Sequence, residues 1–213
     1  MKFNEIIIDY LIVAQYDNKT IKSFEDNYKI PLEKNIEQLD RLDSVHNGLK
    51  EFYTGTANGF SIKWKKNAGS YIDGSINFVP AHIILQDWNY DHWEVEQNEN
   101  IQYFKPFDLF VGEAECGFIV RPDEVYPSIY YHELGEEPIL YSLDLDFNGY
   151  CQMAVEARIY VYWQLVVLSI NGSGKGGAIA EDFKKDMTEI FPDFSWEGFV
   201  EKYNAVRLSN QNK

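Results

Sequence analysis

The sequence predicts an α+β fold in one domain, with a mostly antiparallel or mixed central sheet flanked by N-terminal and C-terminal helices. Three observations support this prediction. Apolar residues recur at helical spacing in about the first 56 residues, alternate with polar residues over much of 59–147, and return to helical spacing after 148. Helices, then a run of strands, then helices are typical of α+β proteins rather than of alternating βαβ units. The 213 residues show no internal repeat and no linker, so we expect a single domain over 1–213.

The N-terminal part is expected to be helical. Phe3, Ile6, Ile7, Tyr10 and Leu11 share one helical face and predict a helix over 3–15. Further helices are expected at residues 20–27, about 33–42, and 46–56 (HNGLKEFYTGT).

The middle of the chain is expected to form strands. Phe60, Ile62 and Trp64 alternate with polar neighbours, as in a half-buried strand. The residues between 66 and 74 (KNAGSYIDG) have turn composition. Other strands are expected at residues 74–80, 103–111, 116–120, 128–133 and 138–147, with a short helix at 81–88.

The C-terminal third returns to helical patterns. Helices are expected over 148–168, in GGAIAEDFKKDMTEIF at 176–191, and in SWEGFVEKYNAV at 195–206. A flexible loop is expected at 172–177 because four of its six residues are glycines.

One stretch, SLDLDFNGY at 142–150, resembles the start of a calcium-binding EF-hand loop. Its matching residues are Asp144, Asp146, Asn148 and Gly149. A calcium loop needs a bidentate Glu at its twelfth position, and that position is Val155. We therefore interpret Leu143, Leu145 and Phe147 as the inward face of a strand, and Asn148 as the N-cap of the next helix.

A second stretch, NGSGKGG at 171–177, resembles part of a phosphate-binding loop. The pattern requires Gly five residues before the Gly-Lys pair and Ser or Thr after the Lys, but Ser169 and Gly176 occupy these places. Nucleotide binding is therefore not expected.

The four histidines give no recognisable metal or catalytic motif. His82 and His92 lie ten residues apart with Asp87 and Asp91 between them, so a metal-dependent hydrolase stays open as a third alternative. HExxH, CxxC and G-x-S-x-G patterns are missing from the sequence. We expect no metal, no cofactor and no enzymatic activity.

Two features indicate a soluble cytoplasmic protein. The apolar start, MKFNEIIIDYLIVAQY, is interrupted by Glu5 and Asp9 and lacks a signal-peptide cleavage pattern, and no run approaches the roughly 20 apolar residues that span a bilayer. Cys116 and Cys151 do not make a disulfide framework, which favours a reducing compartment.

The charge is concentrated in the middle of the chain. The net charge is −15, and the stretch from Asp87 to Asp146 holds fifteen acidic residues against only Lys105 and Arg121. Nucleic acid is disfavoured as a partner because phosphate binding needs clustered Lys and Arg. A basic protein surface would be attracted to this region, although a well-solvated acidic face that only keeps the protein soluble is the simpler alternative.

Four segments together resemble a known family. They are LKEFYTGTANGFSIKW at 49–64, GSINFVPAHIILQDW at 74–88, KPFDLF at 105–110 and ILYSLDLDFNGYCQMAVE at 139–156. In their order and spacing they are similar to the SUKH superfamily over about residues 20–168, and the helical segment at about 178–207 is similar to its closing part. The residues that match the family motif are Asn58, Gly59, Trp64, Gly74, Trp88, Phe107 and Asp108. The additional stretch EKNIEQLDRLDSVH at 33–46 departs from the family pattern.

The resemblance implies a non-enzymatic protein-binding domain. Bacterial members of the family are often immunity proteins that neutralise a cognate polymorphic toxin, frequently a nuclease. A nuclease is basic because it grips nucleic acid, so an acidic inhibitor suits it. The expected partner-binding carboxylates are Glu94, Glu96, Glu99, Asp123, Glu124, Glu136 and Glu137. Tyr90, Trp93, Tyr130 and Tyr131 are expected either in this interface or in the core.

The alternative implied by the fungal members of the family is a regulatory or scaffold module, as in regulators of cell-wall glucan synthesis. Such a module also binds proteins, but its partner need not be basic. Neither a nucleic acid nor a membrane is expected as a partner, and the sequence leaves the oligomeric state open.

Overall fold

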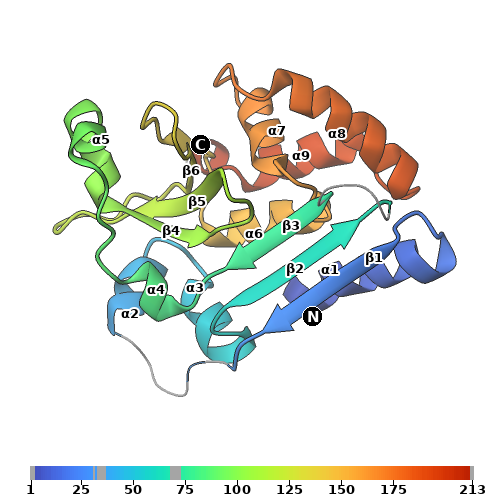
Figure 1. The fold of residues 1–213 in the computed structure, drawn as a ribbon, viewed down its shortest axis with the longest axis horizontal. Coiled ribbons are helices and arrows are strands. Elements are labelled where there is room, and N and C mark those ends of the chain that lie inside the picture. The colour runs from blue at the N-terminus through green and yellow to red at the C-terminus, as the bar shows by residue number, and fades with distance from the viewer. Residues whose placement is uncertain (1–2, 31, 33–36, 68–72, 212–213) are drawn as a thin grey trace. The chain divides into compact units, whose positions relative to one another are not determined.

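The computed structural model describes residues 3–30, 32, 37–67 and 73–211 (Figure 1). Its contacts group the chain into two compact units. Unit 1 comprises residues 1–27, 62–76 and 149–213, and unit 2 comprises 28–61 and 77–148. This grouping into units does not test the expected single domain over 1–213, which stays a prediction.

The strands pair in chain order, β1 to β7, in a seven-stranded sheet. They are β1 Ser23–Tyr28, β2 Phe60–Lys65, β3 Gly74–Phe78, β4 Phe104–Asp108, β5 Ala114–Ile119, β6 Tyr130–Glu133 and β7 Tyr141–Ser142. From β3 to β7 each neighbouring pair is antiparallel, with Phe78 opposite Asp108 and Cys116 opposite Tyr131. The connection between β4 and β5, residues 109–113, is short, as antiparallel neighbours allow, whereas β3 and β4 are joined by the longer segment 79–103. The predicted α+β class with an antiparallel sheet is confirmed.

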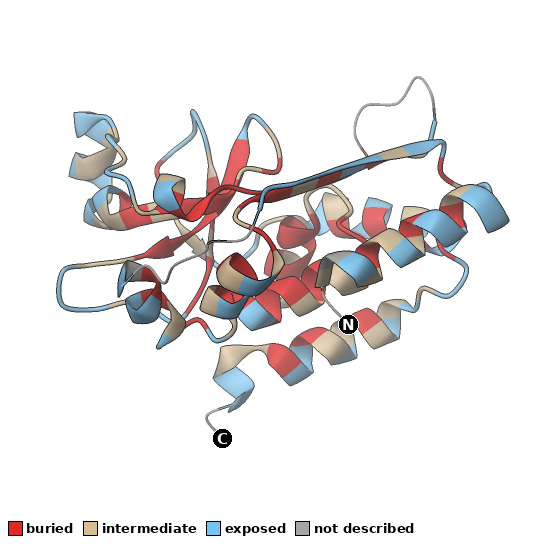
Figure 2. Ribbon diagram, turned by 90° about the horizontal axis from the view of Figure 1, so that it is seen from below, coloured by how far each residue is buried: buried red, intermediate tan, exposed pale blue. Residues whose placement is uncertain are grey.

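Unit 1 holds the N-terminal and C-terminal helices that the sequence predicted. They are α1 Phe3–Ile12 with its π-helical extension Val13–Asp17, α6 Phe147–Glu156 (in unit 1 from Gly149 onward), α7 Trp163–Ile170, α8 Gly177–Ile190 and α9 Trp196–Val206. A short further helix, α10 Leu208–Gln211, was not predicted. α8 buries Ala180, Phe183, Met187 and Ile190, which recur at helical spacing, so one face is apolar and the other is solvated. Figure 2 shows the same division into buried and exposed faces along the longer helices.

The turn between α6 and α7 connects several parts of unit 1. Arg158, Ile159 and Tyr162 have φ of 50°, 51° and 61°, in the left-handed region that side chains other than glycine rarely adopt. The carbonyl of Arg158 accepts a 2.7 Å hydrogen bond from Trp64 Nε1, and the carbonyl of Ile159 accepts one from the Ser75 amide at 2.8 Å. These bonds tie the turn to β2 and β3 and hold its unusual backbone in place.

Unit 2 combines short helices with the rest of the sheet. The helices are α2 Glu37–Asp43, α3 Leu49–Glu51 with its π-helical extension Phe52–Thr56, α4 Ala81–Ile84, α5 His92–Gln97 and the 3₁₀ helix η3 Glu99–Tyr103. Phe52, Phe78, Phe107 and Phe147 are buried and contact one another through edge and tilted ring arrangements. Phe107 also stacks on Phe118 with ring centroids 4.7 Å apart, so aromatic packing forms the core of this unit.

Three sequence predictions of local structure were wrong. The helix expected at 20–27 is instead the edge strand β1, which begins beside the hydrogen bond from the Lys22 amide to the Lys65 carbonyl. The strand expected at 138–147 is reduced to β7, because Asp144 has a φ of 58° and Phe147 already begins α6. Leu143 and Leu145 are buried as expected, but Asn148 is the second residue of α6 and does not cap it.

Three other predictions hold only in part. The helix expected over 148–168 is interrupted by the turn at 157–162. The helix expected at about 33–42 is seen from Glu37 onward, and residues 33–36 lie outside the described residues. Most of the expected turn at 66–74 also lies outside them. Among the described residues, no helix combines the length and apolar character that crossing a bilayer requires.

Candidate docking surface

Helix α5 carries two of the predicted partner-binding carboxylates, Glu94 and Glu96, and was not predicted from the sequence. Asp91 precedes the helix and forms a capping box with Glu94, whose Oε2 accepts a 2.9 Å hydrogen bond from the Asp91 amide. The pattern Asp-x-x-Glu at 91–94 is a known sequence signal for a helix start, so this helix could have been found. Glu94 is therefore partly engaged in holding its own helix.

A prediction follows for the capping box. We expect Glu94→Ala to lower the local stability of α5 by about 1 kcal/mol, because the Asp91 amide loses its partner. Amide hydrogen exchange should become correspondingly faster across residues 92–97. Gln97→Ala, at an exposed position of the same helix, is the control and should leave exchange unchanged. Equal exchange in wild type and Glu94→Ala would show that the box does not stabilise α5.

A small core lies beneath α5, and we call it the α5 core. Its buried centre is Ile101, Phe104 and Ile119. The half-buried residues packed on that centre are Tyr90, Val95, Tyr103, Tyr126, Tyr130 and Leu140. Besides residues of the strands β4, β5 and β6, this core includes residues of α5 and the segment before it, of η3, of the β5–β6 connection and of the β6–β7 connection, so these segments meet at one place in unit 2.

A buried acid–base pair lies beside the α5 core. Glu115 Oε1 and His132 Nδ1 are 3.1 Å apart, and both side chains are almost fully buried. Burial, and then the neighbouring carboxylates of Glu115 and Glu94, raise the pKa of Tyr90 far above its usual value. Burial likewise raises the pKa of Tyr130. These tyrosines therefore stay neutral, and their rings serve as packing surface next to the acidic groups.

Arg121 joins two of the acidic segments. Its Nη2 donates to Glu99 Oε1 at 2.6 Å and to Asn100 Oδ1 at 2.8 Å, and its guanidinium lies 5.3 Å from the centre of the Tyr103 ring. Its carbonyl accepts a hydrogen bond from Arg41 Nη2. The hydrogen bond to Glu99 raises the pKa of Arg121 further. The positive charge of Arg121 is thus used inside the protein, in fixing η3 against the β5–β6 connection.

A second hydrogen bond brings in the β6–β7 connection. Asn98 Nδ2 donates to the Pro138 carbonyl at 2.8 Å, which holds residues 134–140 beside the junction of α5 and η3. We call the exposed side of α5, η3, residues 121–125 and residues 134–140 the acidic face.

The structure separates the predicted carboxylates by their partners. Glu96 lies 3.2 Å from His92, and Glu99 is bound to Arg121. Exposed carboxylates with no ion pair or hydrogen bond to their side chain within the described part of the chain are Asp123, Glu124, Glu136 and Glu137. These four carboxylates are therefore exposed without such an interaction, whereas Glu96 and Glu99 are engaged.

The four predicted aromatic residues differ in exposure. Trp93 is 43% exposed, on the outer side of α5. Tyr90 and Tyr130 are half-buried in the α5 core. Tyr131 is buried in the main core of unit 2, where its ring faces Phe110 at 6.4 Å. Only Trp93 is exposed enough for its ring to contact another protein directly.

The family-motif residues make internal contacts. Asn58 Oδ1 accepts from the Ala81 amide at 3.0 Å, and Asp108 Oδ1 accepts from the Asn77 amide at 2.7 Å. Trp88 Nε1 donates to the Ile83 carbonyl, Phe107 is in the main core, and Gly59 has a φ of 106°. In unit 1, Trp64 packs directly over Gly74. These positions organise the fold.

The structure adds no further ligands or catalytic groups, within the described residues, to the two other sites considered from the sequence, the His82–His92 pair and the glycine-rich loop. His82 and His92 are exposed on α4 and α5, and no group of three or more His, Cys, Asp or Glu side chains arranged to hold a metal occurs in the described ranges. In the glycine-rich loop the side chain of Ser173 donates to the Leu168 carbonyl at 2.8 Å, which turns the chain toward α8.

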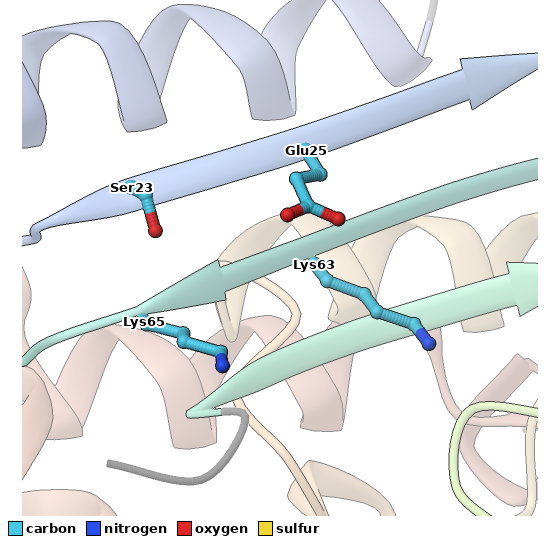
Figure 3. A pocket seen from close by; sticks show the side chains of 4 residues that line it. All are labelled: Ser23, Glu25, Lys63 and Lys65. Atoms are coloured by element: carbon cyan, nitrogen blue, oxygen red, sulfur yellow. The ribbon is translucent and has the colours of Figure 1, made fainter. Parts of the chain in front are cut away.

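Unit 1 has a shallow pocket on the solvated side of β1 and β2. It measures about 240 Å³ and is lined by Ser23, Glu25, Lys63 and Lys65. Figure 3 shows Ser23 and Glu25 projecting from β1 and the two lysines from the neighbouring β2. Opposite charges on adjacent strands, and charged residues along an edge strand, are common ways to stabilise a sheet and to discourage edge-to-edge association. This accounts for the pocket without a ligand.

No family model, curated protein or solved structure matches this chain.

Proposed function

We propose that the protein acts by binding another protein through the acidic face, without bond chemistry of its own. The observation that carries this proposal is the convergence of four acidic segments on the α5 core, with Asp123, Glu124, Glu136 and Glu137 exposed and unpaired within the described residues. Ordered carboxylates gathered on one face create a stronger field than the same charges scattered over a surface.

The two cations of the acidic stretch do little to weaken that field. Arg121 is held by Glu99 and Asn100. Lys105 donates to the Gln86 carbonyl at 2.8 Å and lies 3.8 Å from Asp87, and burial lowers its pKa. Both positive charges are thus engaged within the protein. The acidic face consequently favours a partner that supplies its own Lys and Arg residues.

The partner class that fits best is a basic toxin, with this protein as its cytoplasmic immunity protein. A nuclease toxin carries a basic surface for its nucleic acid substrate, and covering that surface would block activity. The resemblance to the SUKH superfamily favours the same proposal, because its bacterial members often have this role. A regulatory scaffold of the glucan-synthesis-regulator type is the alternative, and the gene context distinguishes the two.

The test uses the C-terminal domain of the protein encoded by the adjacent gene. We expect this domain to be basic, to arrest growth when expressed alone, and to be neutralised by co-expression of this protein. We expect Glu136→Lys/Glu137→Lys to slow association by tenfold or more at low salt and to reduce protection, because two attractive charges become repulsive. Association rates at several salt concentrations and growth curves measure the two effects.

A matched control separates a local from a general charge effect. Glu181→Lys/Glu201→Lys makes the same change of charge at exposed positions of α8 and α9 in unit 1, and should associate and protect like wild type. Circular dichroism should be the same for all variants. Unchanged association by Glu136→Lys/Glu137→Lys would refute the proposal, and a neighbouring gene without a toxic product would favour the regulatory scaffold.

A further inference from the structure

The acidic face also exposes apolar side chains. Trp93 is 43% exposed, Leu134 is 42% exposed and Ile139 is 40% exposed. They lie on α5 and on residues 134–140, the two segments joined by the hydrogen bond from Asn98 to Pro138. Large exposed apolar residues on joined segments with charged neighbours are typical of interfaces rather than of a surface that only confers solubility.

The orientation of Trp93 has a simple cause. Val95 packs into the α5 core, and Trp93 lies two residues earlier, about 200° around the helix, so it points to the opposite side. Trp93 makes no ring contact with another residue among those the structure describes. Its ring is therefore left for contact with something outside the unit.

The position of Ile139 follows from its neighbours. Pro138 is bound by Asn98, and Leu140 packs into the α5 core, so Ile139 is held at the C-terminal end of α5. Trp93 lies about 7 Å from that end along the helix, from the rise of 1.5 Å per residue. Trp93 and Ile139 therefore lie on two segments that the Asn98–Pro138 hydrogen bond holds together.

The charges around them decide which partner fits. Glu96, Glu136 and Glu137 are exposed on the same two segments. A second copy of the chain would place carboxylates against carboxylates, and an anionic membrane surface would also be repelled. A protein surface with an apolar patch surrounded by Lys and Arg matches both properties.

Building on the proposed function, we propose that Trp93 and Ile139 form the apolar centre of the docking surface, so that its partner presents an apolar patch ringed by basic residues. The carboxylates then steer association, and the apolar centre holds the complex together once it has formed. Desolvated aromatic centres with a charged rim carry most of the energy in interfaces of this kind.

Two synthetic peptides of equal positive charge test this inference on the full-length protein. One is an amphipathic helix with a Leu and Trp face and a Lys face, and the other has Ser and Gln in place of the Leu and Trp residues. We expect wild type to bind the amphipathic peptide at least tenfold more tightly in calorimetric titrations. In Trp93→Ser/Ile139→Ser, this preference should disappear while the weaker binding of the polar peptide remains.

The matched control removes exposed apolar groups elsewhere. Ile12→Ser/Tyr16→Ser changes residues that are 41% and 67% exposed in unit 1 and should keep the wild-type preference. Equal binding of the two peptides by wild type, or a preference that survives in Trp93→Ser/Ile139→Ser, would overturn the apolar centre but leave the proposed function standing. Binding of neither basic peptide would count against both.

Discussion

Replacing Gly74 by Ala should destabilise the protein by about 3 kcal/mol or more, because no space exists for the added methyl group. A Cβ atom at this position would lie 2.0 Å from Trp64 Nε1 and 2.2 Å from Trp64 Cε2. The indole cannot easily move aside, since it is 1% exposed and its Nε1 donates to the Arg158 carbonyl at 2.7 Å. Its ring also packs edge-on against Phe191.

Thermal and urea unfolding measure this effect. For a chain of this size we expect the midpoint temperature to fall by about 6 to 12 °C. Gly177→Ala provides the same chemical change as a control, because a Cβ there would have no heavy atom within 4 Å and the residue begins α8. That variant should stay within about 0.5 kcal/mol of wild type. If the two variants unfolded alike, the close packing of Trp64 over Gly74 would not be what stabilises unit 1.

The second large effect is expected from His46 on acidification. This side chain is fully buried in unit 2, with its ring 4.5 Å from the ring of Phe118, and neither ring nitrogen has a hydrogen-bond partner in the described part of the chain. Burial lowers the pKa of His46 from 6.5 to about 4, although the backbone of Tyr126 acts in the opposite direction.

The direction of the pH effect follows from proton uptake. Because the unfolded chain binds a proton on His46 near pH 6.5 and the folded chain only near pH 4, acid favours the unfolded state. The contribution of neutral His46 is complete above pH 6.5 and is lost as the pH falls toward 4. The loss amounts to about 3 kcal/mol, from 1.36 kcal/mol for each unit of pKa.

A pair of variants isolates this contribution from the carboxylates that titrate in the same range. Urea unfolding between pH 7 and pH 4 should show stability falling less steeply in His46→Leu than in wild type. His82→Leu, at an exposed position of α4, should follow wild type throughout. Parallel curves for wild type and His46→Leu would mean that His46 takes up its proton equally well in the folded and unfolded states.

The spacing of apolar residues predicted the helices and strands that bury one regular face, such as β2 and α8. The alternation of Phe60, Ile62 and Trp64 identified β2 and its inward face, and the spacing of Phe183 and Met187 identified α8. Such patterns are reliable because the repeat of a strand or helix matches the repeat of its buried residues. The predicted α+β class rested on these elements.

Hydrophobic periodicity did not predict the strand whose hydrogen-bonding neighbour lies far away in the sequence. β1, Ser23–Tyr28, has one half-buried and five exposed residues, so its sequence carries almost no strand pattern. Its backbone is nevertheless held next to β2 by contacts such as that of Lys22 with Lys65, more than 40 residues later. Helix α5, in contrast, could have been predicted, because the capping signal of Asp91 and Glu94 was present in the sequence.

The sequence by itself determined the sign and size of the charge in the middle of this protein, on which the proposal of a basic partner rests. Only the tertiary structure decided which carboxylates remain available, since Glu94 caps α5 and Glu99 binds Arg121, whereas Glu136 and Glu137 stay exposed. The physical reason is that composition adds charges regardless of position, while ion pairing depends on distances of a few ångströms between residues far apart in the chain.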